Sequence, residues 1–414
     1  MQVESLDNKT ATVPLPRQSS AKASKRPLRI MHVVSSLGRG GAELGILKLV
    51  SGLDPEIFEH RLCATRDFDP DFVHAFQLDS VFNVAGRSDS TFQFPFFRLK
   101  KLFERHRPDI VHTRNWGALE AVPAARRAGV PVIIHSEHGY EVDMLKGMQL
   151  RRRLFRHFAY AMTDAVFAVT RELRDYHALQ AWISPERIGV MYNGVDTERF
   201  SASPEKRNRV RNELCISSST FVIGSVGRLV AIKDYRTLLR AAEIIAQRGK
   251  DIRVVLVGEG REREILEAQV RSSAELSGRV TLAGASDSVP DLLNAMDVYV
   301  LSSLREGMSN TLLEAMSTSL PIVATRMGGN PEAIEEQRSG FFFFPGDVVH
   351  LADLLERLCS DTELRKRLGA ASRDRAVAEF SLRQMLQRYH ALYLEQAQRR
   401  GLAGTSLKAT NSRS

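Results

Sequence analysis

The sequence predicts an α/β protein built from two doubly wound parallel sheets in tandem. Short runs rich in β-branched residues alternate with amphipathic stretches of helical periodicity along most of the 414 residues. This alternation is typical of βαβ units, whose parallel sheets carry helices on both faces. It stops at a polar stretch, 201–219, and then starts again. A chain of this length also exceeds one ordinary core and suggests two domains.

The first series of expected strands begins near residue 28 and contains the runs 28–34, 61–64, 81–84, 110–113, 132–135, 165–169 and 188–192. Helical patterns between several of these strands cover 42–53, 97–107 and 117–128. The expected strands of the second series are 221–226, 253–257, 280–282, 298–301, 321–324 and 341–344. Its helical patterns cover 235–248, 262–273, 289–296 and 310–317. Ligands of such sheets bind beyond the carboxyl ends of the strands, so the loops at those ends are the informative ones.

The two ends of the chain carry most of its net charge of +9. Residues 1–27 hold five basic and two acidic side chains, and residues 398–414 hold four basic and none acidic, which leaves +2 for the body. A nucleic-acid-binding protein usually shows a basic folded face, so this class is disfavoured. We expect disordered tails at 1–27 and 399–414.

Several other classes are disfavoured by what the sequence lacks. The sequence contains no run of 18 apolar residues, so we expect no membrane span. Its first residues contain no apolar core of a secretory signal. The three cysteines, Cys63, Cys215 and Cys359, lie far apart and form no C-x-x-C pair. Neither a disulfide framework nor a zinc cluster is therefore indicated, and a reduced, cytoplasmic setting fits best.

The segment from Glu306 to Glu314 follows an expected strand and opens an expected helix. Ser309 and Asn310 are residue types that often cap helix N-termini. Such a terminus attracts anions through its N–H groups and its positive dipole end. Carboxylates accept hydrogen bonds, so each Glu can hold a pair of vicinal hydroxyls. The segment suits a sugar–diphosphate–ribose ligand; the plainer interpretation is two acids favoured by the helix dipole.

A second candidate loop, GRLVAIK at 227–233, leaves the first strand of the second domain. Arg228 and Lys233 place two cations there, where they can neutralise a diphosphate and stabilise the charge that grows as it leaves. A solvated basic loop is the alternative. The GEG turn at 258–260 follows the next strand and is interpreted as turn chemistry.

The loop GRGGAE at 38–43 joins the first strand to the first helix. Its glycines allow the backbone to approach a ligand phosphate at the helix N-terminus. The loop lacks the full G-x-G-x-x-G fingerprint, and no acid stands out at the end of the second strand, so a nicotinamide cofactor is disfavoured. The sequence also contains no G-x-x-x-x-G-K-[ST] phosphate loop.

The segment HSEHG at 135–139 ends another expected strand. Two His and one Glu suggest a metal site, but no third partner stands at a useful spacing, so we expect no metal. We expect His138 to hydrogen-bond a sugar hydroxyl; a merely structural histidine is the alternative.

One basic amphipathic stretch lies at 150–158. Leu150, Leu154, Phe155 and Phe158 share a helical face, and four arginines surround it, Arg151, Arg152, Arg153 and Arg156. Such a helix can lie on an anionic membrane surface. The same basic patch would gain from Arg98, Lys100, Lys101, Arg105 and Arg107. The alternative is a core-packed helix with solvated arginines.

Together these motifs resemble those of the GT-B glycosyltransferases of family 4, also called glycosyl transferase group 1. The family's E-x7-E signature is matched within EGMSNTLLEAMSTSLPIVAT, its GR…K loop by GRLVAIKDYRTLLRAA, and its first-domain elements by GGAE and EHG. The four occur in order over about residues 29–398. The resemblance implies two Rossmann-like domains facing across a cleft, 28–200 for the acceptor and 201–380 for the donor, with a helix at 381–398 crossing back to the first domain.

The resemblance also implies roles for individual residues. Glu306 would contact the donor sugar, and Glu314 would hold the ribose. Arg228 and Lys233 would bind the diphosphate and stabilise it as the leaving group, and His138 would contact the sugar. The rest of the donor site would be formed by Gly40, Gly41, Gly227, Gly307, Met308, Ser309, Asn310, Thr311 and Leu312. Family members are typically metal-independent and retain the anomeric configuration. Asp234 departs from the family, since many members have Gly there, and this puts the shape of that loop in question.

The implied enzyme moves a sugar from a UDP-, GDP- or ADP-sugar to a saccharide or polyprenyl-diphosphate-linked acceptor, without a cofactor. It would act in the cytoplasm or on the inner face of the plasma membrane. The segment HSEHGYE further resembles a subgroup tied to bacterial exopolysaccharide and exosortase systems. Two alternatives stay open: a nucleotide-sugar epimerase of the same fold, and an inactive partner subunit that binds nucleotide sugars.

Overall fold

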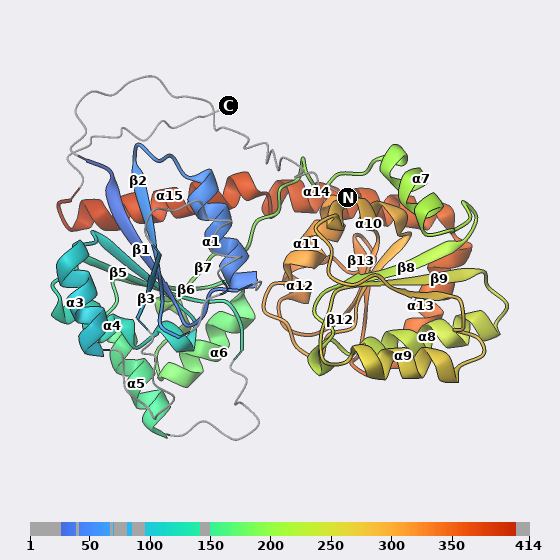
Figure 1. The fold of residues 1–414 in the computed structure, drawn as a ribbon, viewed down its shortest axis with the longest axis horizontal. Helices are drawn as coiled ribbons and strands as arrows, with labels where there is room; N and C mark the ends of the chain where they lie inside the picture. The colour runs from blue at the N-terminus through green and yellow to red at the C-terminus, as the bar shows by residue number, and fades with distance from the viewer. Residues whose placement is uncertain are drawn as a thin grey trace, which may run out of the picture. The chain divides into compact units, whose positions relative to one another are not determined.

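The computed structural model describes residues 26–38, 41–66, 69, 81–84, 96–140 and 150–402. Most of the two predicted disordered tails, 1–25 and 403–414, lies outside these residues. Within them the chain forms two parallel sheets with helices, which confirms the predicted α/β class (Figure 1).

The first sheet has seven strands in the order β3-β2-β1-β4-β5-β6-β7. Its strands are β1 (Leu28–Val34), β2 (Phe58–Ala64), β3 (Val81–Asn83), β4 (Ile110–Arg114), β5 (Val132–Glu137), β6 (Ala165–Ala168) and β7 (Gly189–Val190). The central strand β1 pairs in parallel with both β2 and β4. The seven expected strands are all found, with ends that differ by up to three residues.

The second sheet has six strands in the order β10-β9-β8-β11-β12-β13. Its strands are β8 (Phe221–Val226), β9 (Ile252–Val257), β10 (Val280–Leu282), β11 (Val298–Leu301), β12 (Ile322–Thr325) and β13 (Gly340–Phe343). In both sheets the strand order reverses beside the first strand, between β1 and β4 and between β8 and β11. Ligands of doubly wound sheets bind at the carboxyl ends of the strands at this point.

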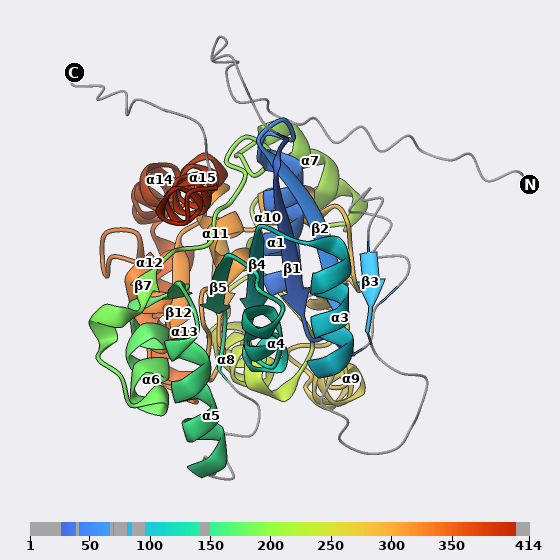
Figure 2. The same ribbon diagram turned by 90° about the vertical axis from the view of Figure 1, so that its left-hand side faces the viewer.

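Helices of the first half of the chain begin at the loops that follow the strands. They are α1 (Gly41–Gly52), α3 (Phe96–His106), α4 (Ala121–Arg127), α5 (Leu150–Ala161) and α6 (Arg171–Ala181), with short 3₁₀ turns at Trp116–Ala118 and Pro185–Arg187. Helices α3 and α4 pack side by side (Figures 1 and 2). The last helix, α15 (Leu382–Arg399), meets the first sheet, because the Tyr393 hydroxyl lies 2.8 Å from His112 Nδ1.

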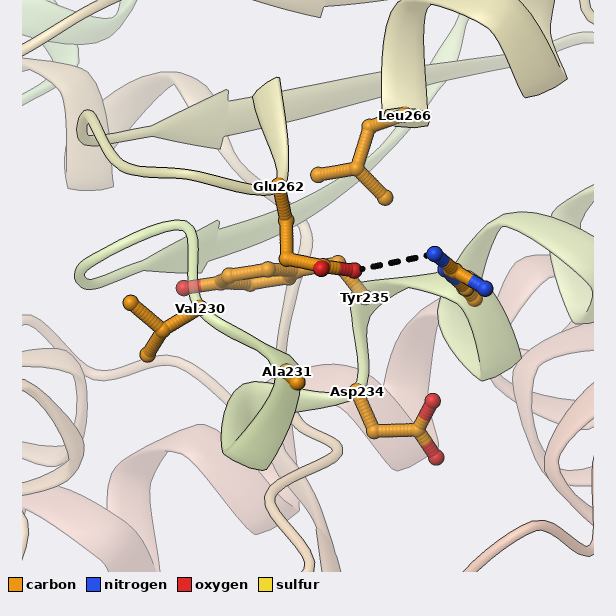
Figure 3. A pocket seen from close by; sticks show the side chains of 7 residues that line it. Val230, Ala231, Asp234, Tyr235, Glu262 and Leu266 are labelled. Carbon is orange, nitrogen blue, oxygen red and sulfur yellow. Dashed lines mark ion pairs between the residues drawn. The ribbon is translucent and has the colours of Figure 1, made fainter. Parts of the chain in front are cut away.

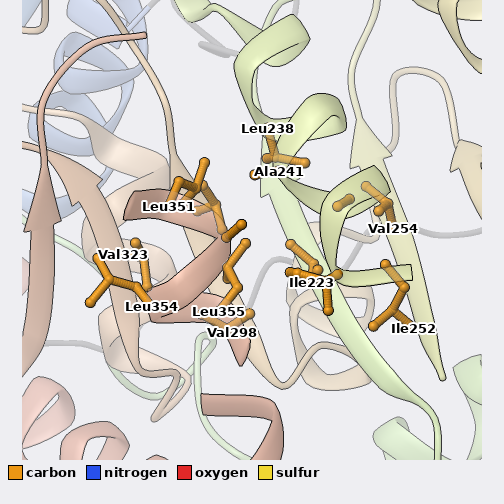
Figure 4. Close-up of a cluster of buried hydrophobic side chains, with 14 of the residues drawn as sticks. Ile223, Leu238, Ala241, Ile252, Val254, Val298, Val323, Leu351, Leu354 and Leu355 are labelled. Atoms are coloured by element: carbon orange, nitrogen blue, oxygen red, sulfur yellow. The ribbon is translucent and has the colours of Figure 1, made fainter. Parts of the chain in front are cut away.

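Helices of the second half pack in pairs, α8 with α13, α7 with α10, and α11 with α14 (Figure 1). Their bounds are α7 (Pro204–Glu213), α8 (Tyr235–Gln247), α9 (Arg263–Ser272), α10 (Val289–Ala295), α11 (Asn310–Ser317), α12 (Asn330–Ala333), α13 (Val348–Ser360) and α14 (Thr362–Glu379). A 3₁₀ turn, η4 (Ala231–Lys233), precedes α8. Figure 4 shows the aliphatic core between α8, α13 and the sheet, with Ile223, Val298 and Leu355 among its buried members.

Helix α7 occupies the polar stretch 201–219 that the sequence offered only as a boundary. Ser203 caps its N-terminus and Pro204 takes the first helical position, both common helix-start residues. Arg207 and Arg211 each form an ion pair with Asp297 at 2.6 Å. Long-range ion pairs therefore hold this helix in place, and its hydrophobic pattern does not predict them.

The chain divides into two compact units. Met1–Ser136, Leu154–Val166 and Leu386–Ser414 belong to the first, and Glu137–Arg153 and Phe167–Met385 belong to the second. In the part of the chain that the structure describes, no helix is both long and apolar enough to cross a membrane.

Candidate active site

The loop after β8 is packed backbone to backbone against the loop after β9. A Cβ atom on Gly258 would lie 2.0 Å from the Gly227 carbonyl oxygen, and one on Gly260 would lie 2.2 Å from that of Leu229. The Leu229 N–H donates to the Glu259 carbonyl at 2.8 Å. The GEG turn thus needs its glycines for close approach, and it supports the loop that carries Arg228.

Asp234, at the position where many family members have Gly, adopts a left-handed backbone and caps α8. Its φ is 46°, in the left-handed region that Asp tolerates better than most residues. Its carboxylate also caps α8, because Oδ1 accepts from the Thr237 N–H at 3.4 Å and Oδ2 from the Thr237 hydroxyl at 2.7 Å.

A small cavity of about 260 Å³ lies beside this loop, against α8 and α9. Figure 3 shows Glu262 and its ion pair with Arg236, at 3.2 Å, next to the Tyr235 ring. The cavity is lined by none of the predicted donor contacts. Its volume is also below the roughly 300–1,000 Å³ of ordinary ligand pockets, so we do not place the donor there.

The loop after β11 brings Glu306 to Lys233. The Ser302 hydroxyl donates to the Lys233 carbonyl at 2.8 Å, and the Leu304 N–H donates to the Ile232 carbonyl at 2.8 Å. These bonds join the loops after β8 and β11, where the strand order reverses. Lys233 Nζ and Glu306 Oε1 form a direct ion pair, and the Ser303 hydroxyl donates to the same Oε1 at 2.9 Å.

Arg228, the other predicted cation, is exposed, and its guanidinium has no hydrogen-bond or ion-pair partner among the described residues. Both side chains of the Lys233–Glu306 pair are 15% exposed. The two cations therefore differ: Lys233 is held by a carboxylate, whereas Arg228 is exposed to solvent.

Helix α11 begins where the sequence predicts. Ser309 is its N-cap and accepts from the Leu312 N–H at 3.3 Å. The Tyr299 hydroxyl lies 2.8 Å from Thr311 Oγ1 and donates to the Val226 carbonyl at 3.2 Å. Burial raises the pKa of Tyr299, so this support stays a neutral hydroxyl. The Tyr299 hydroxyl thus connects the first turn of α11 to β8 and β11.

The side chains of Met308 and Leu312 are buried. We therefore expect the backbone groups of these two residues, not their side chains, to contact the donor. Glu314 lies in the second turn of α11 and is half-buried. The Met308 carbonyl accepts from Asn193 Nδ2 at 3.1 Å.

Two glycines after β12 pack under the Glu306 turn. A Cβ on Gly328 would lie 1.9 Å from the Glu306 carbonyl oxygen, and one on Gly329 would lie 2.2 Å from that of Gly307. The Gly329 N–H donates to the Gly307 carbonyl at 3.0 Å. Sequence analysis missed this support, although a GG pair in the loop that leaves a strand was a usable signal.

His138 follows β5 and is half-buried, and a Cβ on Gly307 would lie 2.7 Å from its carbonyl oxygen. The structure therefore brings His138, Gly307, Glu306 and Lys233 into one region of the second unit. Arg305 lies beside them, with its guanidinium 4.0 Å from the centre of the Tyr140 ring. His135, by contrast, is buried, with Nδ1 2.7 Å from the Thr113 hydroxyl.

Comparison with known proteins decides the family. Residues 39–199 match the family described as Glycosyltransferase Family 4, and residues 220–361 match Glycosyl transferases group 1. A galactosyltransferase of Escherichia coli, named as acting from UDP-Gal on α-D-GlcNAc-diphosphoundecaprenol, is 30% identical over 303 residues, which are 72% of this chain and 78% of that protein. The chain belongs to glycosyltransferase family 4.

Another relative of this family 4 glycosyltransferase is named for polysaccharide biosynthesis, and a solved structure shares its fold. A capsular polysaccharide biosynthesis glycosyltransferase of Staphylococcus aureus is 25% identical over 300 residues, 70% of this chain and 78% of that one. The crystal structure of HepE from Anabaena in complex with UDP matches with a TM-score of 0.76 and 21% identity, covering 89% of this chain and all of that one. The last similarity shows that the fold is that of the GT-B glycosyltransferases, as predicted.

The predicted glycines of the first domain are not placed beside this site. Gly40 lies outside the described residues, and Gly41 is the first residue of α1 in the other unit of the glycosyltransferase. Among the described residues no group of three or more His, Cys, Asp or Glu side chains is arranged to hold a metal ion.

Proposed function

We propose that this glycosyltransferase moves a sugar from a nucleoside-diphosphate sugar to a saccharide or polyprenyl-diphosphate-linked acceptor, with retention of the anomeric configuration. The observation that carries the proposal is the contact of Lys233 with Glu306 where the strand order of the second sheet reverses. The names of the E. coli and S. aureus relatives support a role in cell-envelope or exopolysaccharide synthesis, and the UDP bound to HepE makes UDP-sugars the first donors to test.

The proposed chemistry needs positive charge where the C1–O bond of the donor breaks. The acceptor hydroxyl oxygen forms the new bond to C1, the old bonding pair goes to the diphosphate oxygen, and the acceptor proton passes to the leaving diphosphate. Arg228 and Lys233 stabilise the charge that develops there. The N-terminus of α11, at Asn310 and Thr311, adds its dipole. Glu306 accepts hydrogen bonds from sugar hydroxyls, and Glu314 accepts from the ribose. No metal or cofactor takes part in this proposal.

The site assignment is tested by Glu306→Ala and Lys233→Ala, each assayed for transfer after its melting curve shows a folded protein. We expect Glu306→Ala to abolish transfer and Lys233→Ala to lower kcat by about a hundredfold or more. Glu363→Ala, at an exposed position in an ion pair with Lys366, serves as the control and should leave kcat unchanged. A folded Glu306→Ala variant with full activity would show the assignment to be wrong.

Two assays separate the alternatives. Isomerisation of the donor without any acceptor would favour an epimerase, and donor binding without turnover on a broad acceptor panel would favour an inactive partner subunit. A thermal-shift screen of UDP, GDP and ADP comes first, because a ligand specific for the folded state raises the melting temperature.

We also propose that the enzyme is cytoplasmic and contacts the inner membrane surface through α5. Leu150, Leu154 and Phe158 are 62%, 40% and 60% exposed. Their exposure supports the surface role, although Phe155 of the same predicted face packs against the Trp116 ring, with the two ring centres 5.9 Å apart. One detail of the prediction is wrong: Arg156 is buried, with its guanidinium 5.0 Å from the Trp116 ring. Arg151 is exposed, whereas Arg153 donates to the Leu179 carbonyl at 2.8 Å.

Cosedimentation with vesicles of anionic and of neutral lipid tests this surface. We expect binding to anionic vesicles at low salt that weakens when Arg151, Arg152 and Arg153 are changed to Ala, and that falls as salt rises. Absence of binding at low salt would contradict it.

A further inference from the structure

We propose that His177 is a positioning residue for transfer, which holds the turn carrying His138 through a buried pair with Glu137. The inference rests on the proposed function and on the contact with the donor sugar that the sequence predicts for His138. His177 lies on α6, 39 positions after His138 in the sequence, and nothing in the linear sequence marks it.

His177 contacts both neighbours of His138. Its Nε2 lies 3.1 Å from the Gly139 carbonyl oxygen, and its Nδ1 lies 3.4 Å from Glu137 Oε1. The His177 and Glu137 side chains are 0% and 1% exposed, whereas His138 between them is only half-buried. One imidazole ring therefore fixes the carboxylate on one side of His138 and the carbonyl on the other.

The chemistry of the Gly139 contact determines the position of one hydrogen. A carbonyl oxygen only accepts, so His177 Nε2 carries a hydrogen and donates to Gly139. Nδ1 lies at ion-pair distance from Glu137 Oε1, and the two side chains carry opposite charges when His177 is protonated. The ring is therefore placed between the two neighbours of His138.

Hydrogen bonds hold the first turn of α6, the helix that carries His177. The Thr170 hydroxyl caps the helix by accepting from the Leu173 N–H at 3.1 Å. The Glu332 carboxylate accepts from the N–H groups of Arg171 and Glu172 at 2.9 and 3.0 Å. A second tie to the same turn comes from Tyr140, whose hydroxyl donates to Glu172 Oε1 at 2.5 Å.

The experiment compares kcat and donor KM of folded variants of the full chain. We expect His177→Ala to lower kcat by about tenfold to a hundredfold, the usual effect of a misplaced active-site group, while the donor KM changes little. Glu137→Gln should restore most of what Glu137→Ala loses, because the Gln amide can donate to Nδ1 of a neutral His177. His177→Asn and His177→Gln, which keep a donor near Nδ1 or Nε2 respectively, extend the test if His177→Ala does not fold.

The decisive measurement is a double-mutant cycle with His138→Ala. If His177 acts through His138, adding His177→Ala to His138→Ala lowers kcat no further. An equal loss of kcat in both backgrounds, or a folded His177→Ala variant within twofold of the wild-type kcat, would overturn the positioning role. Full activity of His138→Ala alone would instead refute the role proposed for His138, so the two failures are distinguishable.

Discussion

The two sheets share the order of six strands, but one face of the first sheet buries a polar cluster that, among the described residues, the second sheet lacks in its aliphatic core. Between α8, α13 and the second sheet lies an aliphatic core (Figure 4). Under α15, the first sheet instead carries His32, His60, His112 and Arg114, all of them buried. The first sheet also buries aliphatic residues such as Ile110 and Val111, and the hydrogen-bonded polar cluster is an addition to them.

Directed hydrogen bonds connect the polar cluster. A guanidinium only donates, and Arg114 lies 3.0 Å from His32 Nδ1 and 3.3 Å from His112 Nδ1, so both Nδ1 atoms accept. The hydrogens of His32 and His112 then sit on Nε2, 2.9 Å from His60 Nδ1 and 3.0 Å from the Ser136 hydroxyl. The first sheet should therefore respond to pH and the second to changes in volume.

The largest expected effect is in the second core. Leu355 on α13 is fully buried, so Leu355→Ala should lower the free energy of unfolding by about 2–5 kcal/mol. Val349→Ala on the same helix, 58% exposed, should change it by less than about 0.5 kcal/mol. Urea denaturation at two pH values measures both, and the loss at Leu355 should be the same at each. A loss that varies strongly with pH would break the comparison.

We expect acid to destabilise the first sheet. Burial, with the nearby Arg114 charge, lowers the pKa of His60 to about 4 and that of His32 well below its ordinary value. Because the unfolded chain binds these protons first, stability is present above about pH 6.5 and is lost as pH falls toward 4. For His60 the loss is about 3 kcal/mol over this window.

His60→Asn isolates that contribution, since the Asn oxygen can accept from His32 but does not titrate. The stability of the variant relative to the wild type should rise by about 3 kcal/mol between pH 7.5 and pH 4, measured by urea denaturation. Parallel stability curves for the two proteins would contradict the assignment.

A smaller effect separates two buried tyrosines. Tyr393→Phe removes the hydroxyl 2.8 Å from His112 Nδ1, and Tyr299→Phe removes the one beside Thr311. Each should cost about 1 kcal/mol of stability. We expect only Tyr299→Phe to weaken donor binding as well, because Tyr299 supports the first turn of α11. Calorimetric titration with UDP tests this, and equal affinities in both variants would refute it.

The smallest expected effect is that of Asp234→Gly, compared with Asp234→Ala. Asp234→Gly loses a helix cap but relieves the left-handed backbone, so stability should change by only a few tenths of a kcal/mol. Asp234→Ala loses the cap and keeps the strain, and should cost about 1–2 kcal/mol. Thermal melts of the two variants give the order, and an Ala variant as stable as the Gly variant would contradict it.

Much of the fold could be predicted because its signals are local. The runs 28–34 and 221–226 are strands as expected, and the cap at Ser309 starts α11 where predicted. Pairings between distant residues were not predictable. The Glu137–His177 pair and the histidine cluster form only when the strands and α6 are assembled, and their members stand tens of residues apart.

The candidate site shows the same division. Glu306 and Lys233 were found from motifs, and the structure joins them. Ser303 and Gly328 were not, because each acts on the Glu306 turn and has no chemistry of its own that a pattern would mark. Arg156 was misplaced for a related reason, since amphipathic spacing does not show which side of α5 faces the core.

The contact of α15 with the first sheet sets the timing of folding during synthesis. His112 and Tyr393 are 281 residues apart in the chain. At roughly 5–20 residues per second, a ribosome takes about 15 to 60 s to travel that distance. The second sheet is complete before α15 is made, whereas the histidine face of the first sheet, although translated earlier, waits uncovered until the last helix leaves the exit tunnel. The first sheet made is therefore the last to be finished, and a chain truncated before Leu382 would leave it open permanently.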